Sequence, residues 1–352
     1  MTVNFYENGV ELRPLVDSDL SESPAVYDND IDMHAELRRI TAGGLLFPSN
    51  DTNPHFYLRM FEPDKVRWGG IIRCGNGPLE PHTSVHYQDI AQSGAEIVRY
   101  HKISNNPLTY TIGTKNPFSE FTWTAKSSHW IEGEDGCVLD VKAEYFPFAI
   151  FIHLNSPFHS TYFVQFLTLT GTYEGHPIKA ISWFDRPCVP KGTGERGLDS
   201  PIKEGIPAAL QYVNCWYAGF REDGRKELVW AVIPEHNGEG VGIYWIEGQD
   251  PIVAFDVTLE ADWQHLNYAK DDPTVCFTKA TWRFGGKRIH FIGKWGGKGQ
   301  LEKPRMDRKG LCQVYGTWYE GDTEYKHTEW TTYNEISHMP EDVVKRMGFT
   351  IL

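Results

Sequence analysis

Two stretches of this 352-residue chain nearly repeat each other, with their first glycines 145 positions apart. The first is Gly171–Gly175 (GTYEG) and the second is Gly316–Gly321 (GTWYEG); each ends in a Glu-Gly pair that suits a hairpin turn. Self-similarity at a fixed period is typical of repeated structural units. The pair therefore predicts two β domains of similar plan, each ending in a hairpin. Because few residues match, two unrelated hairpins are the alternative.

The composition supports a folded, β-rich chain. Aromatic residues make up 14% of the sequence, with 12 Trp, 17 Tyr and 19 Phe, and the apolar share is 40%. Such a chain can bury a sizeable core, which excludes an intrinsically disordered protein. Aromatic side chains are typical of β-strands, and they also line pockets for apolar or planar ligands.

Charge and cysteine content narrow the class of protein. The chain has 34 Lys and Arg against 47 Asp and Glu, a net charge of −13, and no long basic run, so we expect no nucleic-acid partner. The first residues lack the basic and apolar parts of a secretory signal. The longest apolar stretch, Phe146–Leu154, is too short to span a membrane. The six cysteines form no CxxC pair and are expected to be free thiols, as in a cytoplasmic protein.

Strand and turn signals follow one another from about residue 46 onward. Val138–Tyr145 alternates apolar and polar residues, which predicts a strand with one solvated face. Leu228–Ile233 and Gly242–Ile246 are continuously apolar, which predicts strands covered on both faces. Hairpin turns are expected at Glu222–Arg225 and Phe284–Lys287. Without intervening helices, this pattern favours antiparallel β-barrels or sandwiches over βαβ units.

The domain layout follows from breaks in this pattern. The segment Asp30–Ile40 has an acidic first turn, a basic last turn and a following Gly43-Gly44, so it is expected to form a helix. A stretch rich in Pro, Gly and charge marks the linker. The expected parts are a lead-in with this helix over 1–45, a first β domain over 46–186, a linker over 187–207, and a second β domain over 208–352 with a short helix at Pro340–Met347.

The layout resembles the two-domain lipocalin-like family that includes the carotenoid 1,2-hydratases and the fungal β-barrel Diels–Alderases. The residues that carry the resemblance are Leu167–Asp185, with Trp183-Phe184-Asp185, the linker that follows, and the region around Trp330. The resemblance implies two consecutive antiparallel β-barrel or sandwich domains over about residues 50–338. It also implies a hydrophobic cavity that acts on a polyene, terpenoid or polyketide without a bound redox cofactor.

One group of candidate catalytic residues lies in Glu80–Asp89. On a strand, His82 and His86 share a face, and two imidazoles there could transfer a proton. A third zinc ligand in register is not apparent, so no metal is expected. Tyr87, next to His86 in sequence, is a candidate substrate contact. The alternative is a set of polar residues at a strand edge.

A second candidate is Asp185, which lies two residues after Trp183 on the same face of a strand. A carboxyl held against an apolar wall has a raised pKa and can protonate an alkene or a leaving hydroxyl. Asp185 is therefore the first choice as the acid, with Trp183 in the cavity wall. The alternative is that Trp183 packs in the core and Asp185 caps a turn before Pro187.

Further candidate substrate contacts lie on two other strands. Tyr212, Asn214 and Trp216 share one face of a strand and Tyr217 lies on the other, while Arg59 lies between aromatic residues with Trp68 nearby. An Asn beside aromatic rings suits a carbonyl anchor, and an Arg suits an enolate or carboxylate oxygen. Ordinary strand and surface positions are the alternatives.

No nucleotide-binding or hydrolase motif is present: the chain has no GxxxxGK[ST], HExxH or GxSxG, and no GxGxxG after a strand. The leading hypothesis is a cofactor-independent lyase or isomerase that hydrates, dehydrates or cyclises a hydrophobic natural product; a homodimer is one possible assembly. The alternatives are a non-catalytic carrier of an apolar ligand, and a carbohydrate-active protein using Glu174 and Asp185 as a carboxylate pair.

Overall fold

In the computed structural model the chain forms two compact units. Unit 1 comprises Met1–Cys74 and Glu80–Ser200, and unit 2 comprises Gly75–Leu79 and Pro201–Leu352. The residues that the structure describes are 10–14, 35–37, 40–46, 55–62, 65–73, 80–81, 101–102, 108–112, 119–123, 127–133, 137–154, 160–190, 212–234, 240–265, 275–293, 311–314, 316–337 and 341–351.

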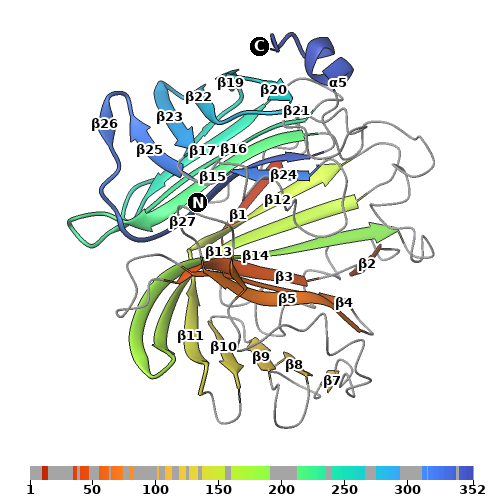
Figure 1. The fold of residues 1–352 in the computed structure, drawn as a ribbon, viewed down its shortest axis with the longest axis vertical. Coiled ribbons are helices and arrows are strands. Elements are labelled where there is room, and N and C mark those ends of the chain that lie inside the picture. The colour runs from red at the N-terminus through yellow and green to blue at the C-terminus, as the bar shows by residue number, and fades with distance from the viewer. Residues whose placement is uncertain are drawn as a thin grey trace. The chain divides into compact units, whose positions relative to one another are not determined.

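Unit 1 is one antiparallel sheet with 14 strands in the described residues. Its two longest strands lie in the middle of the sheet and form a hairpin that curves along its length (Figure 1). In order across the sheet, the main path contains β6 (Glu80–Pro81), β5 (Lys65–Arg73), β4 (His55–Glu62), β3 (Ile40–Leu46), β14 (His176–Pro190), β13 (Ser160–Tyr173), β11 (Leu139–Tyr145), β10 (Ser127–Glu132), β9 (Ser119–Trp123), β8 (Leu108–Ile112) and β7 (His101–Lys102). Off this path, β12 (Phe148–Leu154) pairs with β13 and with β1 (Val10–Pro14), and β2 (Ala35–Leu37) pairs with β14.

The first copy of the repeat forms the turn between β13 and β14. Glu174 and Gly175 both have positive φ, 49° and 77°, as a two-residue type I′ hairpin requires. Gly171, three residues earlier, sits in β13 where a Cβ would lie 2.0 Å from the carbonyl oxygen of Asp140. Only glycine lets β11 approach β13 this closely. The first predicted hairpin is confirmed.

The alternation predicted for Val138–Tyr145 is also confirmed. In β11 the side chains of Leu139, Val141 and Ala143 are buried, whereas the polar residues between them are exposed. The cross-strand neighbours of these three on β13 are Tyr173, Gly171 and Leu169. One face of this part of the sheet is therefore core and the other is solvated.

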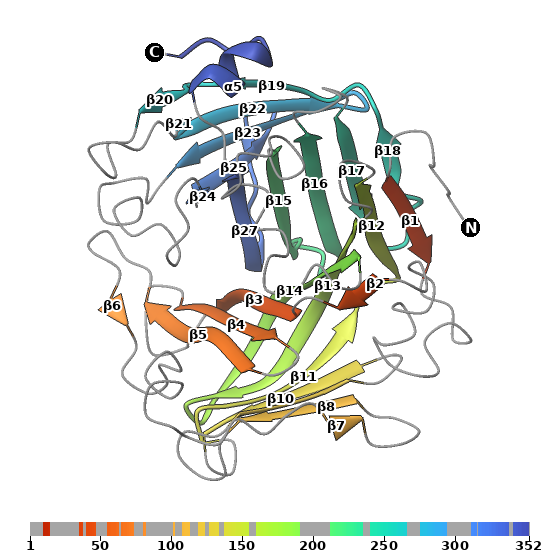
Figure 2. The same cartoon turned by 90° about the vertical axis from the view of Figure 1, so that its right-hand side faces the viewer.

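Unit 2 contains two antiparallel sheets whose strands cross at a steep angle (Figure 2). The six-stranded sheet contains β18 (Ile252–Ala254), β17 (Val241–Ile246), β16 (Lys226–Pro234), β15 (Tyr212–Phe220), β27 (Thr328–Ser337) and β24 (Leu311–Val314). The five-stranded sheet contains β19 (Thr258–Ala261), β22 (Lys279–Phe284), β23 (Lys287–Gly293), β25 (Gly316–Glu320) and β26 (Thr323–Glu324). A third, two-stranded sheet pairs β20 (Gln264–His265) with β21 (Val275–Cys276).

The core of unit 2 lies between the inner faces of its two larger sheets. Trp282 and Trp318 contribute to it from the smaller sheet, and Val229 and Ala231 from the larger one. The Trp282 indole Nε1–H donates to Asn334 Oδ1 at 3.2 Å, which places a hydrogen bond inside this core. The runs predicted to be covered on both faces are buried throughout, as expected.

The second copy of the repeat is also a hairpin, but its turn is displaced by one residue relative to the Glu-Gly pair. Glu320 is the last residue of β25, and Gly321, with φ 59°, begins the turn to β26. Gly316 repeats the role of Gly171, because a Cβ there would lie 2.1 Å from the carbonyl oxygen of Ile292. Counted from the opening glycine, the turn begins three residues on in the first copy and five in the second, so the single extra residue in GTWYEG accounts for only part of the displacement.

Short helical structure confirms one prediction and overturns another. Helix α5 (Glu341–Arg346) lies within the predicted C-terminal helix and is followed by Gly348 with φ 84°. The helix predicted at Asp30–Ile40 is wrong, because β2 occupies Ala35–Leu37 and β3 begins at Ile40. Favourable charges at helix ends contribute only about 0.3–1 kcal/mol each, and pairing with β14 outweighs them.

The predicted linker at 187–207 begins too early, since β14 continues to Pro190 and pairs there with β2. Residues 191–211 lie outside the described residues, so the remainder of this boundary stays a prediction. No helix in the described part of the chain is long and apolar enough to cross a membrane. The predicted all-β class is confirmed: the described residues are almost entirely antiparallel strands, with one short helix among them.

Candidate functional site

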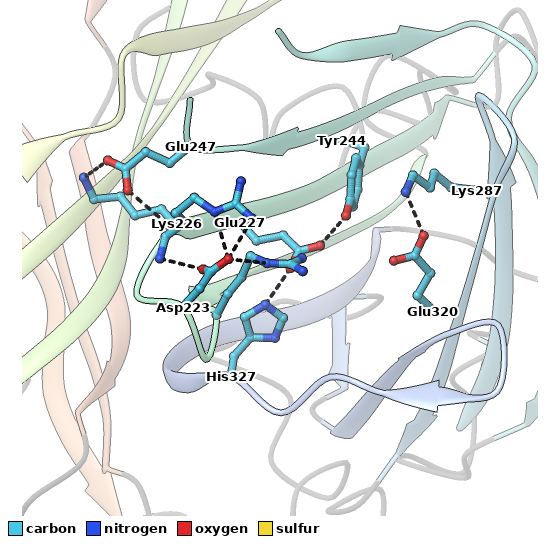
Figure 3. Close-up of polar contacts among 10 residues, drawn as sticks. Asp223, Lys226, Glu227, Tyr244, Glu247, Lys287, Glu320 and His327 are labelled. Carbon is cyan, nitrogen blue, oxygen red and sulfur yellow. Dashed lines mark hydrogen bonds and ion pairs between the residues drawn. The ribbon is translucent and has the colours of Figure 1, made fainter. Parts of the chain in front are cut away.

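A cluster of charged and aromatic side chains lies in unit 2, where two chain segments meet. One segment is the turn 221–225 between β15 and β16, and the other runs from Glu320 at the end of β25 to His327 before β27. The turn is closed by backbone hydrogen bonds from Arg221 N to Arg225 O and from Gly224 N to Arg221 O. Figure 3 shows His327 and Tyr244 pointing toward Glu227, while Lys226–Glu247 and Lys287–Glu320 form separate pairs on either side in this view.

Glu227 is the centre of the cluster. It follows Lys226 at the start of β16, in phase with Val229, Ala231 and Ile233, which point into the core of unit 2. Its side chain is 0% exposed. A buried carboxylate is costly unless its oxygens are satisfied by donors, so this position requires partners.

Three donors satisfy the Glu227 carboxylate. Tyr244 Oη–H donates to Oε1 at 2.5 Å, while His327 Nε2 and Arg221 Nη1 reach Oε2 at 2.7 and 2.8 Å. Burial by itself raises the pKa of Glu227, but the hydrogen bonds from His327 and Tyr244 and the charges of His327 and Arg221 outweigh it, and the net pKa is lowered. Glu227 is therefore an anion at neutral pH and can only accept hydrogen bonds.

The anionic Glu227 sets the tautomer of His327. Because the carboxylate only accepts, Nε2 carries a hydrogen in either charge state, and in the neutral imidazole Nδ1 is left with a lone pair. The His327 side chain is 4% exposed, and Nδ1 is buried without a hydrogen-bond partner among the described residues. A buried acceptor without a partner calls for an explanation. A substrate hydrogen would provide one.

Aromatic rings enclose the imidazole. The ring centroids of Tyr217 and Tyr325 lie 5.0 and 4.9 Å from that of His327, both in edge-on arrangements, and the two tyrosines stack on each other at 5.0 Å. The hydroxyl of Tyr325 is buried with no hydrogen-bond partner in the described part of the chain. Burial, followed by the charge of Glu227, raises the pKa of Tyr325, so it stays protonated and can donate.

Tyr244 is held from its other side by an ion pair. The Lys287 ammonium lies 3.9 Å from the centroid of the Tyr244 ring and 2.7 Å from Glu320 Oε1 (Figure 3). Burial, then the hydrogen bond to Glu227, raises the pKa of Tyr244. The phenol therefore remains a donor to Glu227. Lys226 and Glu247 form a separate ion pair of 2.8 Å.

A pocket of about 580 Å³ opens beside the cluster. Carboxylates, rather than apolar side chains, dominate its lining, which comprises Arg221, Glu222, Asp223, Glu227, Glu320, Thr323, Glu324, Tyr325, Lys326 and His327. Within the described ranges, no three His, Cys, Asp or Glu side chains form a metal-ligand set. The arrangement can bind a polar group and move a proton.

The structure places the predicted acid and base residues in different ways. His82, His86 and Tyr87 lie outside the described residues. Asp185 lies in β14 opposite Val164 of β13 and Thr41 of β3, in regular strand instead of in a turn. Its role stays a prediction.

Among the predicted substrate contacts in unit 1, Trp183 is a core residue of β14, with 1% of its surface exposed. Arg59 in β4 faces Ala42 and Gly69 across the ladder. Trp68 in β5 pairs with Met60. The structure thus distributes these residues over three strands of one sheet, and their contact with a substrate stays a prediction.

The predicted contacts on β15 divide between two faces. Tyr217 points into the core of unit 2 and joins the cluster at His327. Trp216 lies on the opposite face, with Tyr212 and Asn214 in the same phase. Trp216 and Tyr217 therefore cannot line the same cavity wall. Of this set, the structure brings Tyr217 to the described site.

The carboxylate pair proposed for a carbohydrate-active protein is wrong. Glu174 lies in the exposed β13–β14 turn, and Asp185 lies well along β14, which begins at His176. At about 3.3 Å per residue, the strand separates them by roughly 30 Å. Glycosidase carboxylates need a separation of about 5–9.5 Å.

The sequence carries one signal for this site. Glu227 extends the alternation of Val229, Ala231 and Ile233 by one step, so a charged residue occupies a core-facing position. Buried charges of this kind need partners. His327 and Tyr325 lie in an irregular segment before β27, where no periodicity marks them.

No protein-family model matches this chain, and no curated protein sequence matches it. Among solved structures, a protein from Nitrosomonas europaea assigned as AttH matches with a TM-score of 0.47 and 11% identity, over 93% of this chain and 99% of that one. Kievitone hydratase from Nectria haematococca matches with a TM-score of 0.40 and 7% identity, over 86% of this chain and 89% of that one.

CghA in complex with Sch210972 also matches, with a TM-score of 0.39 and 9% identity, over 85% of this chain and 88% of that one. With TM-scores below 0.5 and identities of about a tenth or less, no site residue and no activity is transferred from these proteins to this chain.

Proposed function

We propose that this protein is a cofactor-independent lyase or isomerase that transfers a proton at the Glu227–His327 pair. One observation carries the proposal: a fully buried anionic carboxylate holds a buried imidazole by Nε2 and leaves Nδ1 without a described partner beside a pocket. This is how a general base is oriented in proteins.

The pair is suited to taking a proton from a substrate C–H or O–H. The lone pair on His327 Nδ1 accepts the proton, and the imidazolium that forms is stabilised by Glu227 2.7 Å from Nε2. Arg221 and Tyr244 keep the carboxylate in place and ionised. The charge of the transition state is therefore met by groups that are already oriented.

Tyr325 supplies a donor next to the base. Its ring lies against that of His327, and its hydroxyl is buried and protonated. A hydroxyl donor stabilises the oxygen of an enolate or of a departing hydroxide. A base and a donor at one pocket suit hydration, dehydration or isomerisation of a substrate with a carbonyl or hydroxyl group.

The substrate class predicted from the sequence is a hydrophobic terpenoid or polyketide, and the pocket adds a polar group to it. The pocket beside His327 is lined by charged and polar residues. Such a lining binds the polar, reacting end of a molecule and does not supply an aromatic wall. We therefore propose a natural product that carries a carbonyl or hydroxyl group at the reacting position.

Exchange with solvent tests the proposal on a panel of compounds. The protein is incubated in D₂O with carbonyl- and hydroxyl-bearing terpenoids and polyketides, and mass spectrometry follows deuterium uptake, loss of water or gain of water. We expect His327→Gln to lower the rate at least about 100-fold. His265→Gln is the matched control, because His265 is an exposed histidine paired with Glu341 at 3.0 Å.

Circular dichroism and thermal melting establish that each variant is folded. A folded His327→Gln protein that turns over substrate at the wild-type rate would contradict the proposal. Tight binding by the wild-type protein of a compound that is never converted would instead support the carrier hypothesis. Glu227→Gln, which keeps the shape of the side chain, provides a second variant for the same readout.

A further inference from the structure

Lys287 contributes no atom to the pocket lining, yet it is fixed against the cluster. It begins β23, and its ammonium lies 3.9 Å from the centroid of the Tyr244 ring. Glu320 Oε1 holds the same ammonium at 2.7 Å. The Lys287 side chain is only 22% exposed, so water screens this charge less than it would on an open surface.

A cation over the face of a phenol ring interacts favourably with its π electrons. The interaction draws electron density from the ring and so favours release of the hydroxyl hydrogen. The Tyr244 hydroxyl is thereby made a stronger donor to Glu227, and their distance is short, at 2.5 Å. A stronger hydrogen bond neutralises more of the carboxylate charge that faces His327.

We propose that Lys287 is a positioning residue: by strengthening the hydrogen bond from Tyr244 to Glu227, it sets how readily His327 takes up a proton. The inference rests on the proposed function for its effect on catalysis. The link from Lys287 to Tyr244 stands on geometry alone. It adds to the site a residue that touches neither pocket nor substrate.

Other groups also act on His327, and the test must separate them from Lys287. Besides Glu227 and Tyr244, the charged and titratable groups nearby come from every segment around the pocket. They are Tyr217 of β15, Arg221, Glu222 and Asp223 of the turn, Glu320 of β25, Glu324 of β26, Tyr325 and Lys326. Loss of Lys287 leaves Glu320 unpaired and weakens the Tyr244 donor. Both changes make the surroundings of His327 more negative, so both favour the imidazolium.

The first experiment needs no substrate. Proton NMR of the intact protein follows the hydroxyl hydrogen of Tyr244, assigned by its loss in Tyr244→Phe. We expect Lys287→Met to move this resonance upfield, because the hydrogen bond to Glu227 weakens. Lys287→Arg keeps a cation over the ring and should leave it near its wild-type position. Lys226→Met is the matched control, since it removes a cation that pairs with Glu247.

The second experiment is a double-variant cycle on the pH–rate profile. We expect Lys287→Met to move the acidic limb to higher pH by about half a pH unit, and Lys287→Arg to restore it. In a Tyr244→Phe background the same substitution should have a much smaller effect, because the hydroxyl it acts through is absent.

The outcomes separate the two proposals. An unchanged Tyr244 resonance in Lys287→Met would overturn the positioning role, whatever the activity. An equal shift of the pH–rate profile with and without the Tyr244 hydroxyl would also overturn it, since the charge would then act directly through space. If the Tyr244 resonance shifts but the protein converts no substrate, the Lys287–Tyr244 link is supported and the proposed function is contradicted.

Discussion

The two copies of the repeat share a local structure but serve different purposes. In unit 1, Glu174 is an exposed turn residue with φ 49°. In unit 2 the turn begins one residue after the glutamate, so Glu320 is the last strand residue, where it binds Lys287 and lines the pocket. The position of the turn relative to the Glu-Gly pair thus decides whether the glutamate lies in the turn or in the polar cluster.

The two copies share the position of their opening glycine but differ in the surroundings of their glutamate. The glycines that open the two copies, Gly171 and Gly316, both lie where a neighbouring carbonyl oxygen leaves no room for a Cβ. The glutamates that follow have different environments. The repeat therefore reports backbone geometry, while chemistry depends on what surrounds each copy.

The largest effect should come from the opening glycines. Gly171→Ala and Gly316→Ala each place a methyl group about 2 Å from a backbone oxygen, which forces strands apart. We expect each to lower the free energy of unfolding by about 3 kcal/mol, measured by urea denaturation. Equal losses would support a shared structural role.

The turn glycines provide the control for this prediction. At Gly175 and Gly321 a Cβ would meet nothing within 4 Å, and only the positive φ opposes alanine. We expect a cost of about 1 kcal/mol at each. A loss at Gly171 or Gly316 no larger than at these turns would break the comparison.

The second effect concerns acid stability and should be specific to unit 2. The pKa of Glu227 is lowered in the folded protein, so its contribution is present above the pKa of the unfolded chain and is lost as pH falls through the folded value. We expect the free energy of unfolding to fall more on acidification in the wild-type protein than in Glu227→Gln, which has no carboxyl to protonate at this position. Parallel pH curves for the two proteins would argue against this role.

The smallest effect compares the two repeat glutamates directly. Glu320→Gln removes a partly exposed ion pair with Lys287 and should cost up to about 1 kcal/mol, whereas Glu174→Gln should change stability by less than about 0.5 kcal/mol. Both are measured in the same urea series. Raising the salt concentration should narrow the difference, and a larger cost at Glu174 would reverse the comparison.

Patterns with a local cause were predictable from the sequence. The alternation in β11, the hairpin at Glu174-Gly175 and the helix at Glu341–Arg346 each follow from neighbouring residues. The helix expected at Asp30–Ile40 failed, although its end charges were favourable. Pairing of β2 and β3 with β14 is a non-local interaction, and no pattern within residues 30–40 predicts it.

The candidate site was hidden for the same reason. Glu227 could be recognised as a charge in a core-facing position, but its partner His327 is 100 residues away. The sequence marks Tyr217 only as an aromatic residue on a strand, and the structure places its ring 5.0 Å from that of His327. The imidazole, the carboxylate and the phenol come together only through the order of strands in unit 2, which periodicity does not determine.

The two-residue turn at Glu174-Gly175 also bears on how the chain folds. The ladder between β13 and β14 extends from Tyr173↔His176 to Thr161↔Cys188, so each pair can close next to one already formed. Closing a short loop costs little entropy, and hairpins form in microseconds. The contact between Glu227 and His327 must close a loop of 100 residues. We therefore expect the β13–β14 hairpin to form early and the contact between Glu227 and His327 to form among the last contacts of its unit.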